Sequence, residues 1–169
     1  FKMSSEIEQK SYNGLLVSRY NSDNIYPLLP LLSEEFPNWP LDKIKNYVQL
    51  VTSKKSEEVA GMLVAQNEAF YYVGFLIYTF QSISTEYLST NKKEEFTNGL
   101  VIENILASSP ILKREIFLEI IEYAINIAKK NNCKFIELPN FDETYKLVKK
   151  KYHNKIIKIN NFRTAIDLS

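Results

Sequence analysis

The sequence has few cysteines, histidines and glycines, and each shortage excludes some kinds of protein. Its single cysteine, Cys133, cannot form an internal disulfide, which is typical of a cytoplasmic protein. One cysteine and one histidine, His153, do not supply the ligands of a usual transition-metal site, so we expect no metal. A nucleophilic Cys133 would need His153 beside it in space. A buried thiol near a strand is the favoured interpretation.

The sequence also lacks an excess of charge and a long apolar run. Lys plus Arg number 21 and Asp plus Glu number 20, a net charge of +1, so no overall field attracts nucleic acid or a membrane surface. No apolar run approaches transmembrane length, and residues 1–13 have no apolar core of a signal peptide. We therefore expect one cytoplasmic domain over residues 1–169, with residues 1–13 as a flexible N-terminal segment and no nucleic-acid or membrane partner.

The patterns that are present alternate between strands and helices. We expect strands at residues 14–20, 61–65, 69–80, 99–107, 134–138 and 155–168, the last forming one or two strands. We expect helices at residues 23–35, 41–52, 111–130 and 142–152, and a long polar surface loop at residues 82–98. The apolar residues of segment 111–130 recur every fourth position, as in a helix lying on a sheet. Strand, helix and strand between residues 99 and 138 predict a crossover that joins two parallel strands.

This order resembles the GNAT family of N-acetyltransferases. Ile102–Ala107, the helix that ends at Ala128-Lys129-Lys130 and the strand that ends at Glu137-Leu138 resemble the family's fourth strand, third helix and fifth strand. Residues 14–36 resemble its first strand and first helix, and residues 63–75 resemble its second and third strands. The resemblance implies an α/β fold of the GNAT acyl-CoA N-acyltransferase type, a mixed central sheet of six to seven strands flanked by about four helices.

The family's phosphate-binding signature, Q/R-x-x-G-x-G/A, is altered in this chain. In the family its glycines let backbone N–H groups close on the CoA pyrophosphate at a helix N-terminus. Counting back from Ala128, the six positions fall on residues 112–117, with Glu115 and Phe117 at the glycine positions; the last glycine in the chain is Gly99. Either the N–H groups of residues 111–114 still bind CoA, or the domain has kept the fold without the cofactor.

The resemblance also implies a set of residues around acetyl-CoA. The backbone of the fourth strand would hold the acetyl carbonyl, and the start of the next helix would hold the phosphates, with Lys113 and Arg114 adding charge. The cofactor-binding residues implied are Ile105, Leu106, Ala107, Ile111, Leu112, Lys113, Arg114, Glu115 and Ile116.

Glu103 is the candidate general base of this resemblance. Strict alternation along a strand puts Glu103 on the same face as Val101, Ile105 and Ala107, and a carboxylate in so apolar a strand suits a base at neutral pH. The alternative is an ion pair at the end of the strand. The family's acid is often a tyrosine before a Gly-Phe pair, which this chain lacks; Tyr145 and Tyr152 are candidate donors, with packing their favoured role.

Two clusters have an open role. The basic one either contacts the CoA 3′-phosphate or an acidic partner, or forms a solvated helix face, which we favour; it comprises Lys146, Lys149, Lys150, Lys151 and Lys155. The aromatic one either lines an acceptor pocket near the first two helices or packs in the core, which we favour for most of its members; it comprises Phe36, Trp39, Phe70, Tyr71, Tyr72 and Tyr78.

We therefore expect an acetyl-CoA-dependent N-acetyltransferase that acts on a small-molecule or peptide amine by direct transfer. The missing glycines leave two alternatives. One is a GNAT-fold binding or regulatory module that no longer binds CoA. The other is one half of a homodimeric or larger assembly in which a partner copy supplies catalysis.

Overall fold

The computed structural model describes residues 9–10, 14–21, 23–84, 96–109, 111–139, 142–158 and 163–169. The strands are β1 (Gln9–Lys10), β2 (Leu16–Arg19), β3 (Ala60–Gln66), β4 (Tyr72–Ser84), β5 (Phe96–Ala107), β6 (Phe135–Leu138), β7 (Ile156–Lys158) and β8 (Thr164–Asp167). The helices are α1 (Leu29–Glu35), α2 (Leu41–Thr52), α3 (Lys113–Lys130) and α4 (Asp142–Lys151), with short 3-10 helices η2 (Tyr26–Leu28), η3 (Lys54–Ser56) and η5 (His153–Lys155).

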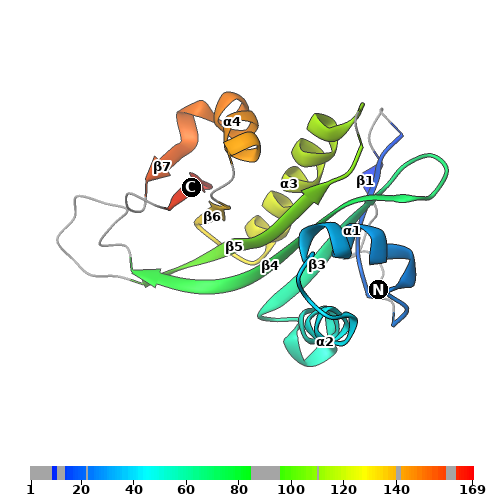
Figure 1. Ribbon diagram of the computed structural model, residues 1–169. Helices are drawn as coiled ribbons and strands as arrows, with labels where there is room; N and C mark the ends of the chain where they lie inside the picture. Colours follow the sequence, from blue (N-terminus) through cyan, green and yellow to red (C-terminus); the bar gives the residue numbers. More distant parts are fainter. Residues whose placement is uncertain are drawn as a thin grey trace.

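The strands form a single mixed sheet in the order β1-β2-β3-β4-β5-β6-β8-β7 (Figure 1). Within the described residues β5 and β6 are the parallel pair, joined through α3 as the crossover pattern predicts, and the other neighbours are antiparallel. The predicted mixed sheet with four flanking helices is thus confirmed. Counting the two-residue β1, which pairs with β2, the described part of the sheet has eight strands.

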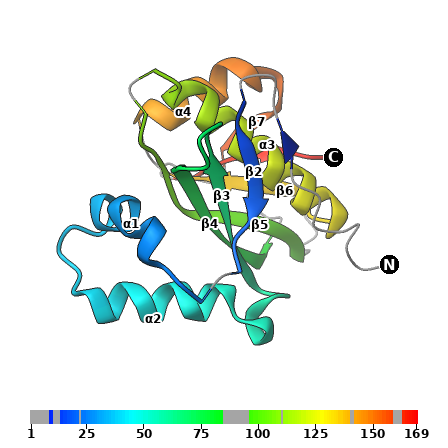
Figure 2. The ribbon, with the colours of Figure 1, turned by 90° about the vertical axis from the view of Figure 1, so that its right-hand side faces the viewer.

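The two faces of the sheet are covered by different helices, which lie on opposite sides of the strands in Figure 2. The face under α3 and α4 is packed by residues such as Leu76, Ile105 and Ile120. The face under α1 and α2 is packed by residues such as Leu32, Val48 and Phe75. Alternate residues of β3 and β4 therefore enter different cores, as expected for strands buried on both faces.

The β4–β5 hairpin is longer than the sequence predicts. Residues 82–84 and 96–98 of the expected loop extend the two strands, with Ser82 paired to Asn98. The composition suggested a loop here, but an antiparallel hairpin can continue through its backbone hydrogen bonds beyond the residues that pack in a core. The rest of the predicted loop, residues 85–95, lies outside the described residues.

The predicted helix over residues 23–35 is divided into η2 and α1. Pro27 and Pro30 each lie in the first turn of one of these elements. A proline in a first turn removes an N–H that has no partner within the helix, so it is tolerated there and starts a new element. This division directs α1 so that its last residue, Glu35, lies over the sheet, where its side chain contacts β5.

Gly74 in β4 allows α3 to lie close to the sheet. A Cβ atom at Gly74 would lie 2.6 Å from Cγ2 of Ile116 and 2.9 Å from the carbonyl oxygen of Leu106. The close approach that a glycine inside a strand predicts is therefore present. It brings the first turn of α3 beside the end of β5, which is where the sequence predicts the cofactor to bind.

Candidate functional site

One edge of β5 is open over its second half. β5 pairs with β4 as far as Ala107, opposite Gly74, but pairs with β6 only from Gly99 to Val101. Figure 1 shows β5 running on past the short β6 alongside α3. In the described part of the chain, residues 102–107 therefore have no strand on the β6 side. Such an edge presents N–H and C=O groups that can pair with a ligand or another chain.

The N-terminus of α3 lies next to this open edge. The N–H of Leu112 donates to Oγ of Ser109 at 3.1 Å, and the N–H of Ile116 donates to the carbonyl of Leu112 at 2.8 Å. By helix geometry, the N–H groups of Arg114 and Glu115 have no acceptor within the helix. Together with the helix dipole they can favour an anion. The N–H of Ile116 is thus hydrogen-bonded within the helix, and its side chain is buried. This predicted cofactor residue therefore offers neither group to a ligand.

The side chains around this helix start are mixed in charge. Lys113 and Arg114 are exposed, Ile111 is 86% exposed, and Leu112 is half-buried against the core. Glu115 has one carboxylate oxygen, Oε2, that is buried with no hydrogen-bond partner among the described residues. A buried oxygen of this kind is costly, and its charge opposes a phosphate. At this helix start Lys113 and Arg114 therefore favour an anion, and Glu115 opposes it.

Glu103 is at a β-bulge, which corrects the face predicted for it. Ile77 pairs with Asn104 and Tyr78 with Ile102, so Glu103 is an extra residue in β5. The bulge interrupts strict alternation, and Glu103 does not share a face with Ile105. Its exposed carboxylate accepts hydrogen bonds from the Thr79 hydroxyl at 2.8 Å and the Gln81 amide at 3.3 Å.

The bulge places Glu103 and Asn104 together on the face of α1 and α2. Tyr78 packs under α3, so its neighbour Thr79, which binds Glu103, points to the opposite face. Asn104 reaches the same face, where it contacts Glu35 of α1 and Tyr47 of α2. The surroundings of Glu103 are therefore polar and exposed, in contrast to the apolar strand that the sequence predicts.

A polar cluster of Glu35, Asn104 and Tyr47 joins α1, α2 and β5. The Tyr47 hydroxyl donates to Oδ1 of Asn104 at 3.0 Å, and Nδ2 of Asn104 donates to Oε2 of Glu35 at 3.3 Å. Burial raises the pKa of Glu35, the hydrogen bond from Asn104 opposes this, and the charge of Glu34 adds to it. Burial, with the charges of Glu103 and Glu35, raises the pKa of Tyr47 to about 12. The phenol therefore remains a donor at neutral pH.

Sequence reasoning missed Glu35 and Tyr47. The one signal that pointed toward them was Asn104, a polar residue next to Glu103 in an otherwise apolar strand. A buried amide needs partners, but the sequence does not say which helices supply them.

The aromatic cluster is only partly where the sequence places it. Phe36 and Trp39 stack with ring centroids 4.4 Å apart, and Tyr47 meets them edge-on at 5.8 and 5.6 Å. Nζ of Lys43 lies 4.2 Å from the centroid of the Trp39 ring. These side chains adjoin the Glu35 cluster, so an aromatic wall on this face is present.

The other predicted aromatic residues lie elsewhere. Phe70 and Tyr71 are 73% and 70% exposed at the β3–β4 turn, and Tyr78 is fully buried under α3. Tyr72 is half-buried and meets Tyr20 edge-on at 6.4 Å. Strand alternation sends Tyr78 to the far face, which removes it from any acceptor site near α1 and α2.

The predicted acid residues and the basic cluster lie on or beside α4. Tyr152 packs against the core under α3, and burial is the main cause of its raised pKa. Tyr145 is in α4, and its side chain lies outside the described part of the structure. Lys151 pairs with Glu122 at 3.5 Å and Lys155 is exposed. A solvated helix face remains our interpretation of this cluster.

Cys133 has the properties of a structural thiol. Its side chain is buried, and burial raises its pKa, so the thiol remains protonated at neutral pH. His153 is exposed. In the described ranges no group of three His, Cys, Asp or Glu residues could hold a metal ion, and no helix is long and apolar enough to cross a membrane.

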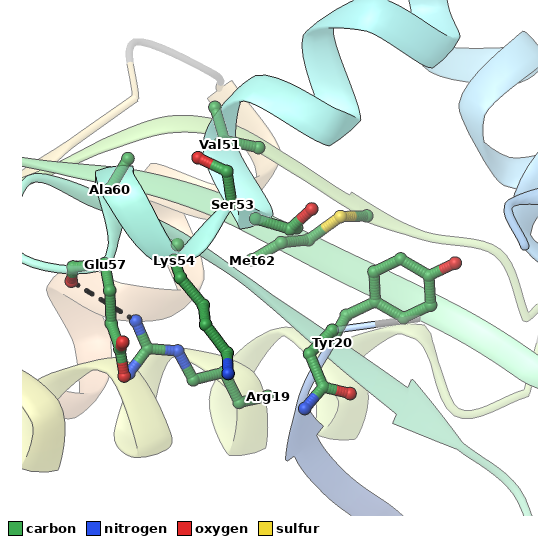
Figure 3. A pocket seen from close by; sticks show the side chains of 11 residues that line it. Arg19, Tyr20, Val51, Ser53, Lys54, Glu57, Ala60 and Met62 are labelled. Carbon is green, nitrogen blue, oxygen red and sulfur yellow. Dashed lines mark hydrogen bonds between the residues drawn. The ribbon is translucent and has the colours of Figure 1, made fainter. Parts of the chain in front are cut away.

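A cavity of about 100 Å³ lies at the other end of the sheet, where β2 ends and β3 begins (Figure 3). Arg19 and Lys54 line it, and Nη2 of Arg19 donates to the carbonyl of Glu57 at 3.4 Å. Ala60 of this cavity and Ala65 beside Gly74 are at opposite ends of β3, so the cavity is separate from the open edge of β5. The open edge, rather than this cavity, is therefore the candidate site.

The arrangement of these elements is that of the GNAT acyltransferase fold. No family model and no curated protein matches the sequence. The chain is similar to the aminoglycoside 6′-N-acetyltransferase AAC(6′)-Ih from Acinetobacter baumannii, with 13% identity, a TM-score of 0.61, and 82% of this chain and 88% of that chain covered. It is similar to aminoglycoside N-acetyltransferase AAC(6′)-Iy in complex with CoA, with 11% identity, a TM-score of 0.63, and 83% and 85% covered.

A third similar structure is a GNAT family acetyltransferase from Staphylococcus aureus, with 13% identity, a TM-score of 0.57, and 78% of this chain and 90% of that chain covered. At such low identities these likenesses define the fold of the chain and leave its activity to be argued from its own residues.

Proposed function

We propose that the protein is an acetyl-CoA-dependent N-acetyltransferase that transfers the acetyl group directly to an amine. The observation that carries this proposal is the open edge of β5 at residues 102–107, directly beside the N-terminus of α3. The pantetheine arm of CoA contains amide groups that can pair with an open strand edge, as an added strand would. Its pyrophosphate would then meet the first turn of α3.

The residues at this helix start support phosphate binding in part. Lys113 and Arg114 supply positive charge, and the N–H groups of the first turn point in the direction that anions favour. Glu115 opposes it through its charge. We expect a weaker CoA affinity than a glycine-containing loop would give, with Lys113 and Arg114 compensating for the missing glycines.

Direct transfer needs a proton acceptor for the amine, a donor for the developing oxyanion and an acid for the leaving thiolate. In this proposal the backbone of Ile105, Leu106 and Ala107 would hold the acetyl carbonyl. A carboxylate on the face of α1 and α2, where Glu103 lies, would receive the proton of the amine. Tyr152 and Tyr145 of the α4 region are the candidate acids.

A specific observation favours a second function. Glu115 has an oxygen that is buried without a partner among the described residues, and the resemblance to the GNAT family puts this residue at a signature glycine position. A GNAT-fold binding or regulatory module that no longer binds CoA can carry such a residue, because it has no phosphate to bind at this position.

The experiment that separates the two is an acetyl-transfer assay that detects the free thiol of CoA with a panel of primary amines. The enzyme hypothesis predicts thiol release that depends on an amine and is lost in a Lys113→Ala/Arg114→Ala double variant with unchanged thermal stability. Thiol release no faster than the uncatalysed rate with every amine favours the binding module.

A further inference from the structure

Glu35 differs from the structural carboxylates of this protein. It is half-buried, and within the described residues its one hydrogen-bond donor is Asn104 and no cation pairs with it. Glu137, also half-buried, is paired with Arg163. A carboxylate removed from water without a cation is costly, and two oxygens can accept about four hydrogen bonds. Glu35 therefore has capacity for a further donor.

The Glu35 carboxylate fixes the orientation of the Asn104 amide. An ionised carboxylate can only accept, so it must face the NH₂ group, and the amide oxygen is left to accept from the Tyr47 hydroxyl. The Tyr47 hydroxyl, which can donate or accept, is compatible with this orientation. The cluster thus holds the Glu35 side chain in position from α2 and β5, and α1 supplies its backbone.

The charges facing Glu35 would attract a cation. Glu34 is on the same helix, and Glu103 is next to Asn104 on β5; both charges are negative. Tyr47 of α2 is neutral, because its pKa is raised to about 12. The basic residue of α2 on this face, Lys43, contacts the Trp39 ring. The local charge is therefore negative.

The aromatic wall adds a second feature of an amine site. Phe36 stacks on the Trp39 ring with centroids 4.4 Å apart, and the Lys43 ammonium lies 4.2 Å from the Trp39 centroid, so both faces of this ring are in use within the protein. The wall therefore offers a ligand apolar area along its ring edges, and the carboxylate of Glu35 supplies the charge. A ligand that combines an ammonium group with an apolar or aromatic body matches both parts of this surface.

We propose that Glu35 is the carboxylate that binds the protonated amine of the acceptor and takes its proton, with Asn104 and Tyr47 as positioning residues. This inference deepens the proposed function and rests on it for the chemical step. The acceptor class is a primary amine carried on an apolar or aromatic body.

The proton count of the step balances. The ammonium R–NH₃⁺ gives one proton to the Glu35 carboxylate and becomes a neutral amine with a free lone pair. Its nitrogen forms a bond to the thioester carbonyl carbon, and the carbon–sulfur bond then breaks. The nitrogen loses a second proton, which the thiolate takes up, so the products are the amide, the CoA thiol and the proton held by Glu35, which water removes.

Amine binding can be tested without CoA, because Trp39 is the single tryptophan of the chain and lies in this cluster. We would titrate phenethylamine against tryptophan emission, with 2-phenylethanol as the uncharged ligand of the same shape. The amine should give a saturable change with an affinity at least about tenfold higher than the alcohol, since a charge-assisted hydrogen bond is worth this much. Equal affinities would overturn the proposal.

The variants assign the binding to Glu35. Glu35→Gln keeps an acceptor for Asn104 and should lower the affinity for phenethylamine at least about tenfold, while 2-phenylethanol is unaffected. Glu68→Gln, the control on an exposed glutamate of the β3–β4 turn, should change it less than about twofold. Wild-type affinity in a folded Glu35→Gln variant, or an equal loss in both variants, would contradict the assignment.

The pH dependence of kcat/KM tests the proton step and the positioning residues. In the wild type, kcat/KM should fall as Glu35 becomes protonated at low pH. Glu35→Gln should remove this acidic limb of the pH profile. Tyr47→Phe should move the limb to higher pH, because a loosened Asn104 stabilises the carboxylate less. A limb unmoved in both variants would exclude Glu35 as proton acceptor. If acetyl-CoA is not turned over, the proposed function fails, and the fluorescence titration still decides the amine site.

Discussion

Replacing Tyr78 with Phe should stabilise the protein, because the tyrosine hydroxyl is buried without a partner. The Tyr78 side chain is 0% exposed, and its Oη has no hydrogen-bond partner among the described residues. It lies against Gly61, where a Cβ would be 2.2 Å from the hydroxyl oxygen. An unsatisfied buried hydroxyl costs about 1–3 kcal/mol of stability. The small void that its removal leaves is destabilising and cancels part of the gain.

We therefore expect Tyr78→Phe to raise the free energy of unfolding by about 1 kcal/mol, which corresponds to about 2–4 °C in Tm for a chain of this size. Burial is the main cause of the raised pKa of Tyr78, and the charge of Arg19 opposes it. Since the folded state holds this proton more tightly, its contribution to stability is lost as pH rises through the raised pKa. The advantage of Tyr78→Phe over the wild type should therefore grow in strongly alkaline solution.

The assay is thermal and urea unfolding followed by circular dichroism, with Tyr20→Phe as the matched control. The Tyr20 hydroxyl donates to the carbonyl of Asn24 at 2.7 Å, so its removal should lower stability by about 1 kcal/mol. The two variants lose the same atom and should change Tm in opposite directions. A Tyr78→Phe variant that is less stable than the wild type by about 1 kcal/mol would refute the reasoning, because it would show that the hydroxyl has a partner.

Three further predictions concern the candidate site. Gly74→Ala should lower stability by about 1–3 kcal/mol in urea unfolding, since its Cβ would meet the backbone carbonyl of Leu106 at 2.9 Å; an unchanged midpoint would exclude this close contact. Lys113→Ala/Arg114→Ala should weaken CoA at least about tenfold by calorimetry without changing Tm, and unchanged affinity would remove both residues from the site. Because burial raises the pKa of Glu35 above 4.5, its proton stabilises the fold fully below that pH and less as pH rises through the raised value. Glu35→Gln should therefore lose less stability than the wild type from pH 4.5 toward neutral pH, and parallel pH profiles would contradict this.

The elements with strong periodicity were predictable from the sequence. The near-continuous apolar run at residues 99–107 predicts the buried half of β5, and the repeat of every fourth residue predicts α3. Their order predicts the parallel pairing of β5 and β6, which is confirmed. The paired outer ends of β4 and β5 were not predictable in this way, since residues 82–84 and 96–98 have the composition of a loop.

The candidate site was less predictable because it depends on register and on distant contacts. The bulge at Glu103 arises from the pairing of two strands, and no residue within β5 marks it. Glu35 and Asn104 are 69 residues apart in sequence, so their contact exists only in the folded sheet. The helix predicted over residues 111–130 begins at Lys113 and ends at Lys130, because the apolar repeat of α3 places it to within two residues.

Binding of acetyl-CoA tests the central claim most directly, and thermal unfolding in increasing concentrations of acetyl-CoA measures it. A ligand that binds only the folded state at a hundred times its Kd stabilises by about 2.7 kcal/mol, or about 5–10 °C in Tm for this chain. Our account predicts a saturable rise of this kind that is lost in the Lys113→Ala/Arg114→Ala variant. An unchanged Tm at millimolar acetyl-CoA would contradict the account and identify the protein as a GNAT-fold module without its cofactor.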